Sequence, residues 1–268
     1  MPCAKARLAG TFAAALAAAC LTPAVAEDGP KVHPAIQAAI DSPDRPEADR
    51  KRDEGRRPGI VLEFFGVRPG QTIIEYTATG GVTAELLART VGPKGKVYMQ
   101  NSPVWLETSG APAEKAIADR LANDRLPNVV RLDKAPEDLG LAPNSVDGAV
   151  MNLVFHDMFW MAKDPSKDVP AILANLYKTL KPGGWVGVVD HAAPIGTGST
   201  MAIDRRGPHR IDEELAKKLF LDAGFKLDKE SKLLRNPDDD HQKPFYAPEW
   251  REKFTDRFAF RFVKPKGS

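Results

Sequence analysis

From Thr72 onward, short runs rich in β-branched residues alternate with stretches whose apolar residues have helical spacing. The expected strands cover residues 72–77, 96–100, 129–132, 145–155, 185–190, 225–233 and 258–263. The expected helices between them cover residues 82–91, 113–123, 171–180 and 211–223. Strands separated by helices of this length predict an α/β fold with a doubly wound, mostly parallel sheet. The last two strands have no obvious helix between them, which predicts an antiparallel strand at the edge of the sheet.

The first 26 residues have the pattern of a signal peptide. Lys5 and Arg7 precede an Ala-rich apolar run over residues 8–21, and Ala24–Ala26 forms an A-x-A cleavage site. The run is too short to span a bilayer. We therefore expect cleavage after residue 26 and export, to the periplasm in a bacterial cell. A cytosolic N-terminal helix and a lipid anchor at Cys20 are the alternatives.

Net charge and cysteine content limit the kinds of binding and catalysis that the sequence supports. Removing Lys5 and Arg7 with the leader leaves 36 basic residues against 36 acidic ones, so charge gives no argument for a nucleic-acid or membrane surface. The two cysteines, Cys3 and Cys20, both lie in the leader. The expected mature chain therefore has no disulfide, thiolate metal site or cysteine nucleophile.

Residues 27–58 are polar, rich in proline and densely charged, and we interpret them as a helical N-terminal cap. The pattern predicts a helix over residues 34–40 and a charged helix that ends near Gly55. Residues 59–268 then form one α/β domain, which begins with a short apolar helix over residues 60–65.

Ligands of an open α/β sheet bind beyond the carboxyl ends of its strands. The first strand ends at Glu75 and leads into Gly80 and Gly81 before a helix, which is either a ligand-binding turn or a tight turn that needs positive φ. Asn101 follows the second strand, where a carboxylate that holds a ribose is expected. Asp133 follows the third strand and fits either a ligand edge or a helix cap.

Two His-Asp pairs follow the fourth and fifth strands. His156 and Asp157 come after Asn152, and Asp190 precedes His191. If these strands are neighbours, the four side chains meet at one edge of the sheet. Such a set suits general acid–base chemistry by either histidine, or a metal site of two imidazoles and one carboxylate, or a purely structural polar rim. No phosphate-binding loop, zinc-protease or serine-hydrolase motif is present.

The chain resembles the class I S-adenosylmethionine-dependent methyltransferases, in particular an exported group of predicted methyltransferases. The resemblance covers about residues 34–265 and lies in the strand–glycine–helix unit over residues 68–95, in Leu180–Gly184 and in residues 223–225. The stretches specific to the exported group are residues 52–53 with 57–58, 155–160, 190–191, 209–212 and 234–237.

This resemblance implies a seven-strand sheet of the Rossmann-like methyltransferase type, with S-adenosylmethionine across the ends of the first four strands. Glu75 and the turn at residues 77–81 are then expected at the methionine moiety, Asn101 at the ribose and Asp133 at the adenine edge. Residues 152–157, from Asn152 to Asp157, are expected to border the methyl-transfer site.

Three positions depart from the family pattern. Thr77 and Thr79 stand where glycines are usual, and Asn101 stands where an acid is usual. Branched side chains obstruct close approach of the backbone, so we expect weaker binding of the cofactor.

The expected function is methyl transfer to an unidentified small molecule, with His156 or His191 removing the acceptor proton. One alternative is a metal-dependent enzyme in which His156, Asp157 and His191 hold the ion. Another is a non-catalytic protein that binds a small ligand on the same fold. No exposed apolar stripe in the sequence argues for an oligomer.

Overall fold

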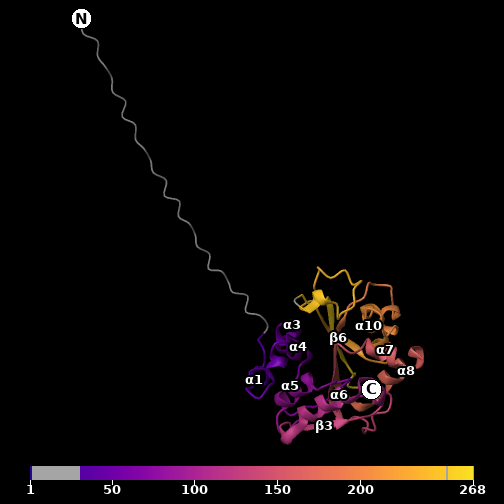
Figure 1. Cartoon of the computed structure of the whole chain (residues 1–268). Helices are drawn as coiled ribbons and strands as arrows, with labels where there is room; N and C mark the ends of the chain where they lie inside the picture. Colours follow the sequence, from indigo (N-terminus) through magenta and orange to yellow (C-terminus); the bar gives the residue numbers. More distant parts are fainter. Residues whose placement is uncertain (2–30, 252, 268) are drawn as a thin grey trace. The chain divides into compact units, whose positions relative to one another are not determined.

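The computed structural model describes residue 1, residues 31–251 and residues 253–267 (Figure 1). The predicted signal peptide, its cleavage site and the alternative anchor at Cys20 lie outside the described residues. Val32–Ser268 form one compact unit. Within the part of the chain that the structure describes, none of the helices combines the length and hydropathy needed to cross a bilayer.

One seven-stranded sheet organises this unit, in the order β3-β2-β1-β4-β5-β7-β6. The strands are β1 (Thr72–Glu75), β2 (Lys96–Gln100), β3 (Val129–Leu132), β4 (Val146–Asn152), β5 (Leu180–His191), β6 (Lys226–Ser231) and β7 (Arg257–Val263). β7 pairs antiparallel with both β5 and β6, and the pairs from β3 to β5 are parallel. The antiparallel arrangement expected for the last two strands is confirmed at this edge of the sheet, with β6 outermost and β7 between β5 and β6.

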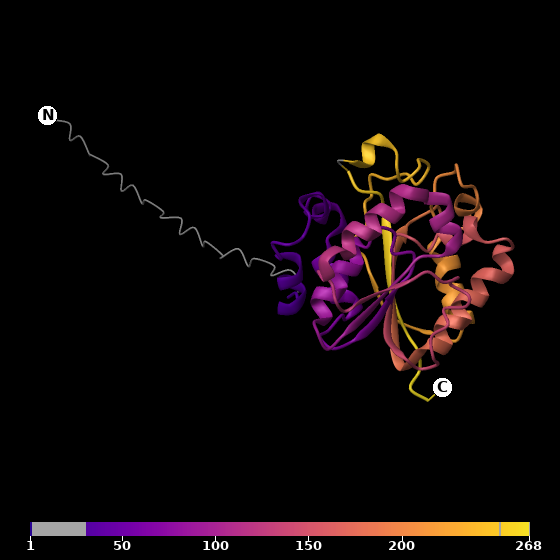
Figure 2. The same ribbon diagram turned by 60° about the horizontal axis from the view of Figure 1, so that its bottom comes forward.

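Helices cover both faces of the sheet (Figure 2). The α-helices are α1 (Pro34–Ile40), α2 (Glu47–Arg50), α3 (Asp53–Arg56), α4 (Pro58–Phe65), α5 (Val82–Val91), α6 (Pro103–Leu121), α7 (Asp157–Met161), α8 (Pro165–Thr179), α9 (Thr200–Ile203) and α10 (Glu213–Asp222). The 3-10 helices are η1 (Ala122–Asp124) and η2 (Pro248–Arg251). The indigo-to-magenta helices lie on one side of the sheet in Figure 2, and the salmon and orange helices lie on the other.

Most expected elements form, with informative differences. The charged helix expected before Gly55 is two short helices, α2 and α3. α6 starts ten residues earlier than expected, at Pro103, because the Ser102 side chain caps it, and its two parts meet at the non-helical Gly110. β4 ends at Asn152 rather than at residue 155, because Leu153 has a φ of 63° and turns the chain out of the sheet. This turn leads to α7, which the sequence pattern did not predict.

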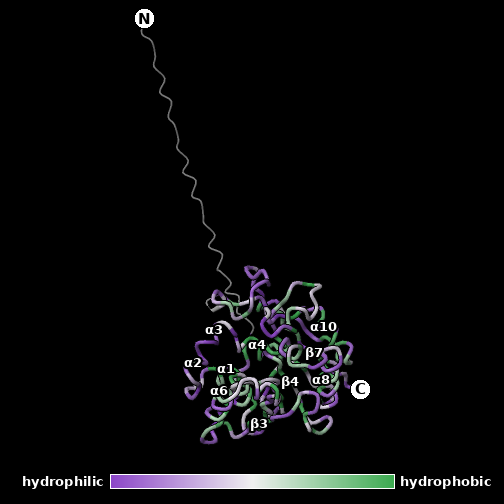
Figure 3. Tube along the Cα trace, turned by 45° about the vertical axis from the view of Figure 1, so that its right-hand side comes forward, coloured by the Kyte–Doolittle hydropathy of each residue, from purple (hydrophilic) through white to green (hydrophobic). Residues whose placement is uncertain are grey.

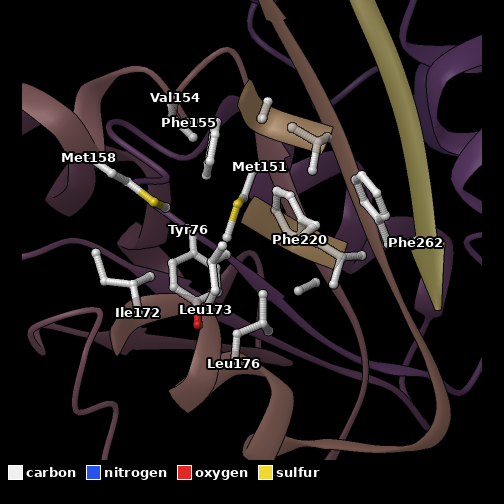
Figure 4. Packing of buried hydrophobic residues seen from close by; sticks show 14 of the residues in the cluster. Tyr76, Met151, Val154, Phe155, Met158, Ile172, Leu173, Leu176, Phe220 and Phe262 are labelled. Atoms are coloured by element: carbon white, nitrogen blue, oxygen red, sulfur yellow. The ribbon is translucent and has the colours of Figure 1, made fainter. Parts of the chain in front are cut away.

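Alternate residues of the central strands bury their side chains in two different cores. Ile74 and Met151 belong to the core under α8 and α10, whereas their neighbours Ile73 and Val150 belong to the core under α1, α4 and α5. Figure 4 shows the first core, with Phe220 lying beside Phe262. In Figure 3 the hydrophobic segments gather at the centre, around α4 and β4. These two cores fix the positions of the strand ends that carry the site.

Candidate functional site

Two cavities lie at the carboxyl ends of the parallel strands. The first, here called the charged cavity, has a volume of about 280 Å³. Its lining includes Glu75, Thr77, Thr79, Asn152, Asp157, His191, Arg52, Arg56, Phe245, Trp250 and Arg257. The second, here called the apolar cavity, has a volume of about 290 Å³ and lies beyond the ends of β2 and β3. Its lining includes Thr77, Ser102, Val104, Ala135, Glu137, Met158, Met161 and Ile172. Thr77 lines both cavities.

The turn after β1 has the backbone conformation of a glycine-rich turn, although it carries two threonines. Thr77, Thr79 and Gly81 have φ values of 46°, 53° and 76°. A β-branched residue in this left-handed region is a conformational outlier that the surrounding structure must hold in place. At Gly81 only glycine fits, since a Cβ there would lie 2.7 Å from the Met99 Sδ.

Two amide side chains from the end of β2 hold this turn. Thr77 N–H donates to Gln100 Oε1 over 2.9 Å, and Thr79 N–H donates to Asn101 Oδ1 over 2.8 Å. Asn101 Nδ2 in turn donates to the Thr79 carbonyl oxygen. Asn101 is fully buried, so both polar groups of the residue predicted to meet a ribose are used to support the strained turn.

Glu75 ends β1 as a buried carboxyl group at the wall of the charged cavity. Its Oε2 has no hydrogen-bond partner among the described residues. Burial raises the pKa of Glu75 to about 8, and the Thr83 hydroxyl and Arg56 offset only part of that effect. An unsatisfied buried carboxyl group beside a cavity is a typical feature of a binding site.

Three guanidinium groups face the same cavity from two directions. Arg52 and Arg56 come from the α3 region of the cap, and Arg257 begins β7. Burial and the neighbouring Arg52 lower the pKa of Arg56. The structure gives the Arg56 guanidinium no hydrogen bond to any described residue. The charged cavity therefore combines a carboxyl group with unpaired positive charge.

His156 lies between two carboxylates and is almost completely buried. Its Nδ1 is 2.7 Å from Asp190 Oδ1, and its backbone N–H donates to Asp190 Oδ2. Burial alone lowers the pKa of His156, but Asp190 and Asp157 outweigh it and raise the pKa to about 10. A histidine held in this way is cationic at neutral pH and is unsuited to removing a proton.

His191 has the opposite electrostatic environment. Burial and the charges of Arg257 and His156 hold its pKa well below the usual range, so the ring is neutral at pH 7. Its Nδ1 lies 2.6 Å from Thr255 Oγ1, and its ring stacks on Phe245 with the centroids 4.6 Å apart. His191 is thus a fixed, neutral imidazole at the cavity wall.

The structure brings the four predicted His and Asp side chains together. The His156 and His191 rings are 5.7 Å apart between centroids, and Asp190 Oδ1 also accepts a hydrogen bond from the His191 N–H. Asp190 is fully buried behind both rings and does not line either cavity, which gives it a positioning role. Asp157 and His191 line the charged cavity. The catalytic roles of these residues stay predictions.

Three other predicted residues lie away from the cavity walls. Asp133 is exposed and pairs with Arg131 over 2.7 Å, and Glu137 lines the apolar cavity instead. Gly80 and Gly81 face α6, where the Gly80 carbonyl oxygen accepts a hydrogen bond from Arg120. These glycines shape the turn, and their part in binding the cofactor remains a prediction.

The sequence interpretation assigned no site role to His209, Arg52 or Arg56. His209 Nδ1 lies 3.5 Å from Asp157 Oδ1, and Trp160 Nε1 donates to the same oxygen. Residues 52–53, 57–58 and 209–212 belong to the stretches that resemble the exported group, and Arg56 does not. For Arg52 and His209, membership of these stretches was the sequence signal that could have indicated a site role.

Comparison with known proteins agrees with this fold. Residues 79–188 match the family model of a methyltransferase domain. A 2-phytyl-1,4-naphtoquinone methyltransferase of Trichormus variabilis is 26% identical over 136 residues, which cover 50% of this chain and 53% of the relative. The chain thus matches about half the length of this curated relative.

Solved structures share the architecture at low sequence identity. A S-adenosylmethionine-dependent methyltransferase from Aquifex aeolicus aligns with a TM-score of 0.56 and 19% identity, over 85% of this chain and 96% of that one. The [4+2]-cyclase SpnF aligns with a TM-score of 0.55 and 16% identity, over 81% and 82% of the two chains. The solved structures show that the chain shares their fold, and the family model places a methyltransferase domain over residues 79–188.

Proposed function

We propose, for a chain whose residues 79–188 match a methyltransferase domain on the class I fold, that it is an exported enzyme that methylates a small molecule with S-adenosylmethionine. The observation that carries the proposal is the charged cavity against the turn after β1. That turn keeps a positive φ at residues 77, 79 and 81, although two of them are threonines.

The charged cavity suits the amino-acid end of the cofactor. An amino acid carries an ammonium and a carboxylate on one carbon, and the cavity presents Glu75 Oε2 without a partner together with the guanidinium of Arg56. Glu75 would accept a hydrogen bond from the ammonium, and Arg56 would donate to the carboxylate. Binding would supply a partner to the buried Glu75 Oε2 and to the half-buried Arg56 guanidinium.

The apolar cavity suits the base of the nucleoside. Its wall includes Val104, Met158, Met161 and Ile172, and the Ser102 hydroxyl adds a polar group. Flat aromatic rings bind well between such side chains, and methionine adapts to their shape. A ligand that reaches from one cavity to the other must pass Thr77, so this side chain would govern the affinity.

When bound, the cofactor supplies an electrophilic methyl group. The chain's own task is to hold the acceptor in line with that group and to take its proton. His191 is our proposed base, since it is neutral and lines the charged cavity, whereas His156 is held between Asp190 and Asp157 and does not line that cavity. Stacking on Phe245 and the contact with Thr255 hold the His191 ring in one orientation.

Calorimetric titration of the mature chain with S-adenosylmethionine tests the binding step. We expect saturable 1:1 binding by the wild type. The variant Arg50→Gln serves as a matched control, because Arg50 is exposed and does not line either cavity. No heat and no rise in melting temperature at millimolar cofactor would overturn the proposal.

Turnover is tested with methyl-tritiated S-adenosylmethionine and a panel of small phenols, thiols and amines. We expect label in an acceptor with the wild type. His191→Gln should lower kcat with little change in cofactor affinity, because it removes the base and leaves the carboxyl and guanidinium groups. A variant with unchanged kcat over the pH range would argue against His191 as the base.

Export is proposed from the positive start, apolar run and A-x-A site of residues 1–26. The test is N-terminal sequencing of the full chain after expression in a bacterium with two membranes. Recovery in the periplasmic fraction with Glu27 as the first residue supports it, and recovery in the cytoplasm with the leader intact contradicts it.

A second candidate function is non-catalytic binding of a small ligand. The observation in its favour is that Gln100 and Asn101 already satisfy the turn N–H groups that could otherwise meet a ligand. This candidate predicts a co-purified small molecule in native mass spectrometry and no transfer of label from S-adenosylmethionine.

A further inference from the structure

Three side chains whose atoms can coordinate a metal ion lie beside the charged cavity. His156 Nε2 lies 3.2 Å from Asp157 Oδ1, and His209 Nδ1 lies 3.5 Å from the same oxygen. One atom from each of the three residues lies within 4.8 Å of the other two. Zinc bonds of 2.0–2.1 Å in a tetrahedron place neighbouring ligand atoms about 3.3 Å apart, so the observed spacing fits one ion.

The two nitrogens that face this point are unsatisfied. His156 Nε2 and His209 Nδ1 are buried and have no hydrogen-bond partner in the described part of the chain. The 3.2 Å approach of His156 Nε2 to Asp157 does not have the alignment of a hydrogen bond. Buried polar atoms in folded proteins are nearly always satisfied, so two such nitrogens facing one carboxylate indicate a missing ligand.

The far side of each ring is held as in a metal-binding histidine. His209 Nε2 lies 2.6 Å from the Arg205 carbonyl oxygen, which only accepts, so Nε2 carries a hydrogen and, in the neutral ring, Nδ1 presents a lone pair. His156 Nδ1 faces the Asp190 carboxylate over 2.7 Å. Metal-bound histidines generally donate their second N–H to a carboxylate or a carbonyl group in this way.

The carboxylate has its own support. Trp160 Nε1 donates to Asp157 Oδ1 over 2.7 Å and fixes the orientation of the side chain. A lone pair on His209 Nδ1 facing an ionised carboxylate at 3.5 Å is repulsive unless a cation lies between them. The two carboxylates that stabilise a positive charge on His156 would stabilise a metal cation at its Nε2 in the same way, and the ion would replace the proton there.

We propose that His156 Nε2, His209 Nδ1 and the Asp157 carboxylate bind one divalent first-row transition-metal ion. Two imidazoles and one carboxylate are a donor set for Zn²⁺ or Fe²⁺ with open coordination positions. Asp157 lines the charged cavity, so those positions are accessible to a ligand bound there. His191 is not part of the set, since its Nδ1 contacts Thr255 and it faces the cavity separately.

Zinc binding to the untagged, chelator-treated full chain tests the proposal, with a competing dye as the readout. The wild type should bind one Zn²⁺ per chain, and His209→Gln should bind at least about 100-fold more weakly. Trp160→Phe removes the donor to Asp157 and keeps an aromatic ring beside His209, and it should weaken binding by about 10-fold. His191→Gln should bind zinc like the wild type.

His33→Asn is the matched histidine control, because His33 only caps α1 and asparagine is also a good cap. Absence of stoichiometric zinc in the wild type, or equal affinity in His209→Gln, would overturn the proposal. X-ray absorption of the zinc-loaded wild type keeps the test valid even if a variant fails to fold. Two imidazole ligands support the proposal, and fewer than two contradict it.

The metal site does not depend on methyl transfer. All these measurements are made without S-adenosylmethionine, so failure of the zinc test leaves the proposed methyltransferase untouched, and the reverse also holds.

Discussion

Two buried glutamates, ten residues apart in the sequence, have opposite environments. Glu85 in α5 is surrounded by Arg89, Arg120 and Arg125, and its oxygens accept hydrogen bonds from all three. Burial alone would raise the pKa of Glu85, but these arginines outweigh that effect and lower the pKa to about 2. Glu75 at the end of β1 has one oxygen without a partner, and its pKa is raised to about 8.

The comparison distinguishes a carboxylate that stabilises the fold from a carboxyl group that is available to a ligand. The Glu85 cluster also includes Asp49 of α2, which pairs with Arg120, so it joins the cap to α5 and α6. Its charges are matched within the protein. The carboxyl group of Glu75 and the guanidinium of Arg56 are close to the same cavity without matching partners, which leaves them available to a ligand.

Glu85→Gln should cause the largest effect on stability. Three partly buried arginines would lose the carboxylate that they share, and breaking such a buried network costs about 3–5 kcal/mol. Urea unfolding at pH 7 measures it. Glu114→Gln is the control, because Glu114 forms an exposed pair with Arg131 and should leave the midpoint nearly unchanged. Equal midpoints for the two variants would contradict a structural role for Glu85.

The two glutamates should also impose opposite pH dependences. The raised pKa of Glu75 means that the folded state holds its proton more tightly, so this group's contribution to stability falls as pH rises from about 4.5 to about 8. The lowered pKa of Glu85 means that its contribution falls as pH drops from about 4.5 to about 2.

Urea unfolding of the wild type and Glu75→Gln between pH 4 and 9 measures the first slope. The variant should gain stability over the wild type as pH rises, by on the order of a few kcal/mol at pH 9. A constant difference between the two proteins would show that Glu75 ionises normally.

Arg56→Gln should weaken S-adenosylmethionine binding by about 10–100-fold, the loss expected for a charge-assisted hydrogen bond. Calorimetric titration gives the two dissociation constants, with Arg50→Gln as control. If Arg56→Gln binds as tightly as the control, the cofactor carboxylate lies elsewhere.

Thr77→Gly should have the smallest effect on stability, a gain of about 1 kcal/mol from relief of the positive φ. It should also tighten cofactor binding by several-fold, because the side chain between the cavities is removed. Thr77→Ala separates these causes, since it reduces bulk but keeps the strained Cβ. Melting temperature and calorimetric titration of both variants provide the measurements.

Local sequence patterns predicted helices and strands correctly where the residues' intrinsic preferences match the structure that they form. α1 begins at Pro34, where proline at the first turn favours a helix, and α5 and β2 have the predicted bounds. The place of β7 between β5 and β6 depends on pairing between distant strands, which local periodicity does not encode. α7 depends on the left-handed Leu153, a residue type that gives no signal for such a turn.

The site was predictable only where neighbouring strands determine it. His156 comes after β4 and His191 ends β5, and the convergence of the two residues results from the parallel pairing of these strands. His209 reaches Asp157 from a connection far along the chain, and no spacing rule links them. Arg52 and Arg56 belong to a charged segment that is typical of a solvated surface. The packing of Gly55 against Phe254 and the hydrogen bond from Arg257 to the Gly55 carbonyl oxygen bring the cap close to the sheet ends.

Thr77 lines both the charged cavity and the apolar cavity. Two different fragments should therefore bind in the two cavities at the same time without competing. A tethered pair gains affinity over its separate halves only when the tether follows an open route. Inhibitor discovery against this protein is therefore better begun with independent fragments than with nucleoside mimics of fixed length.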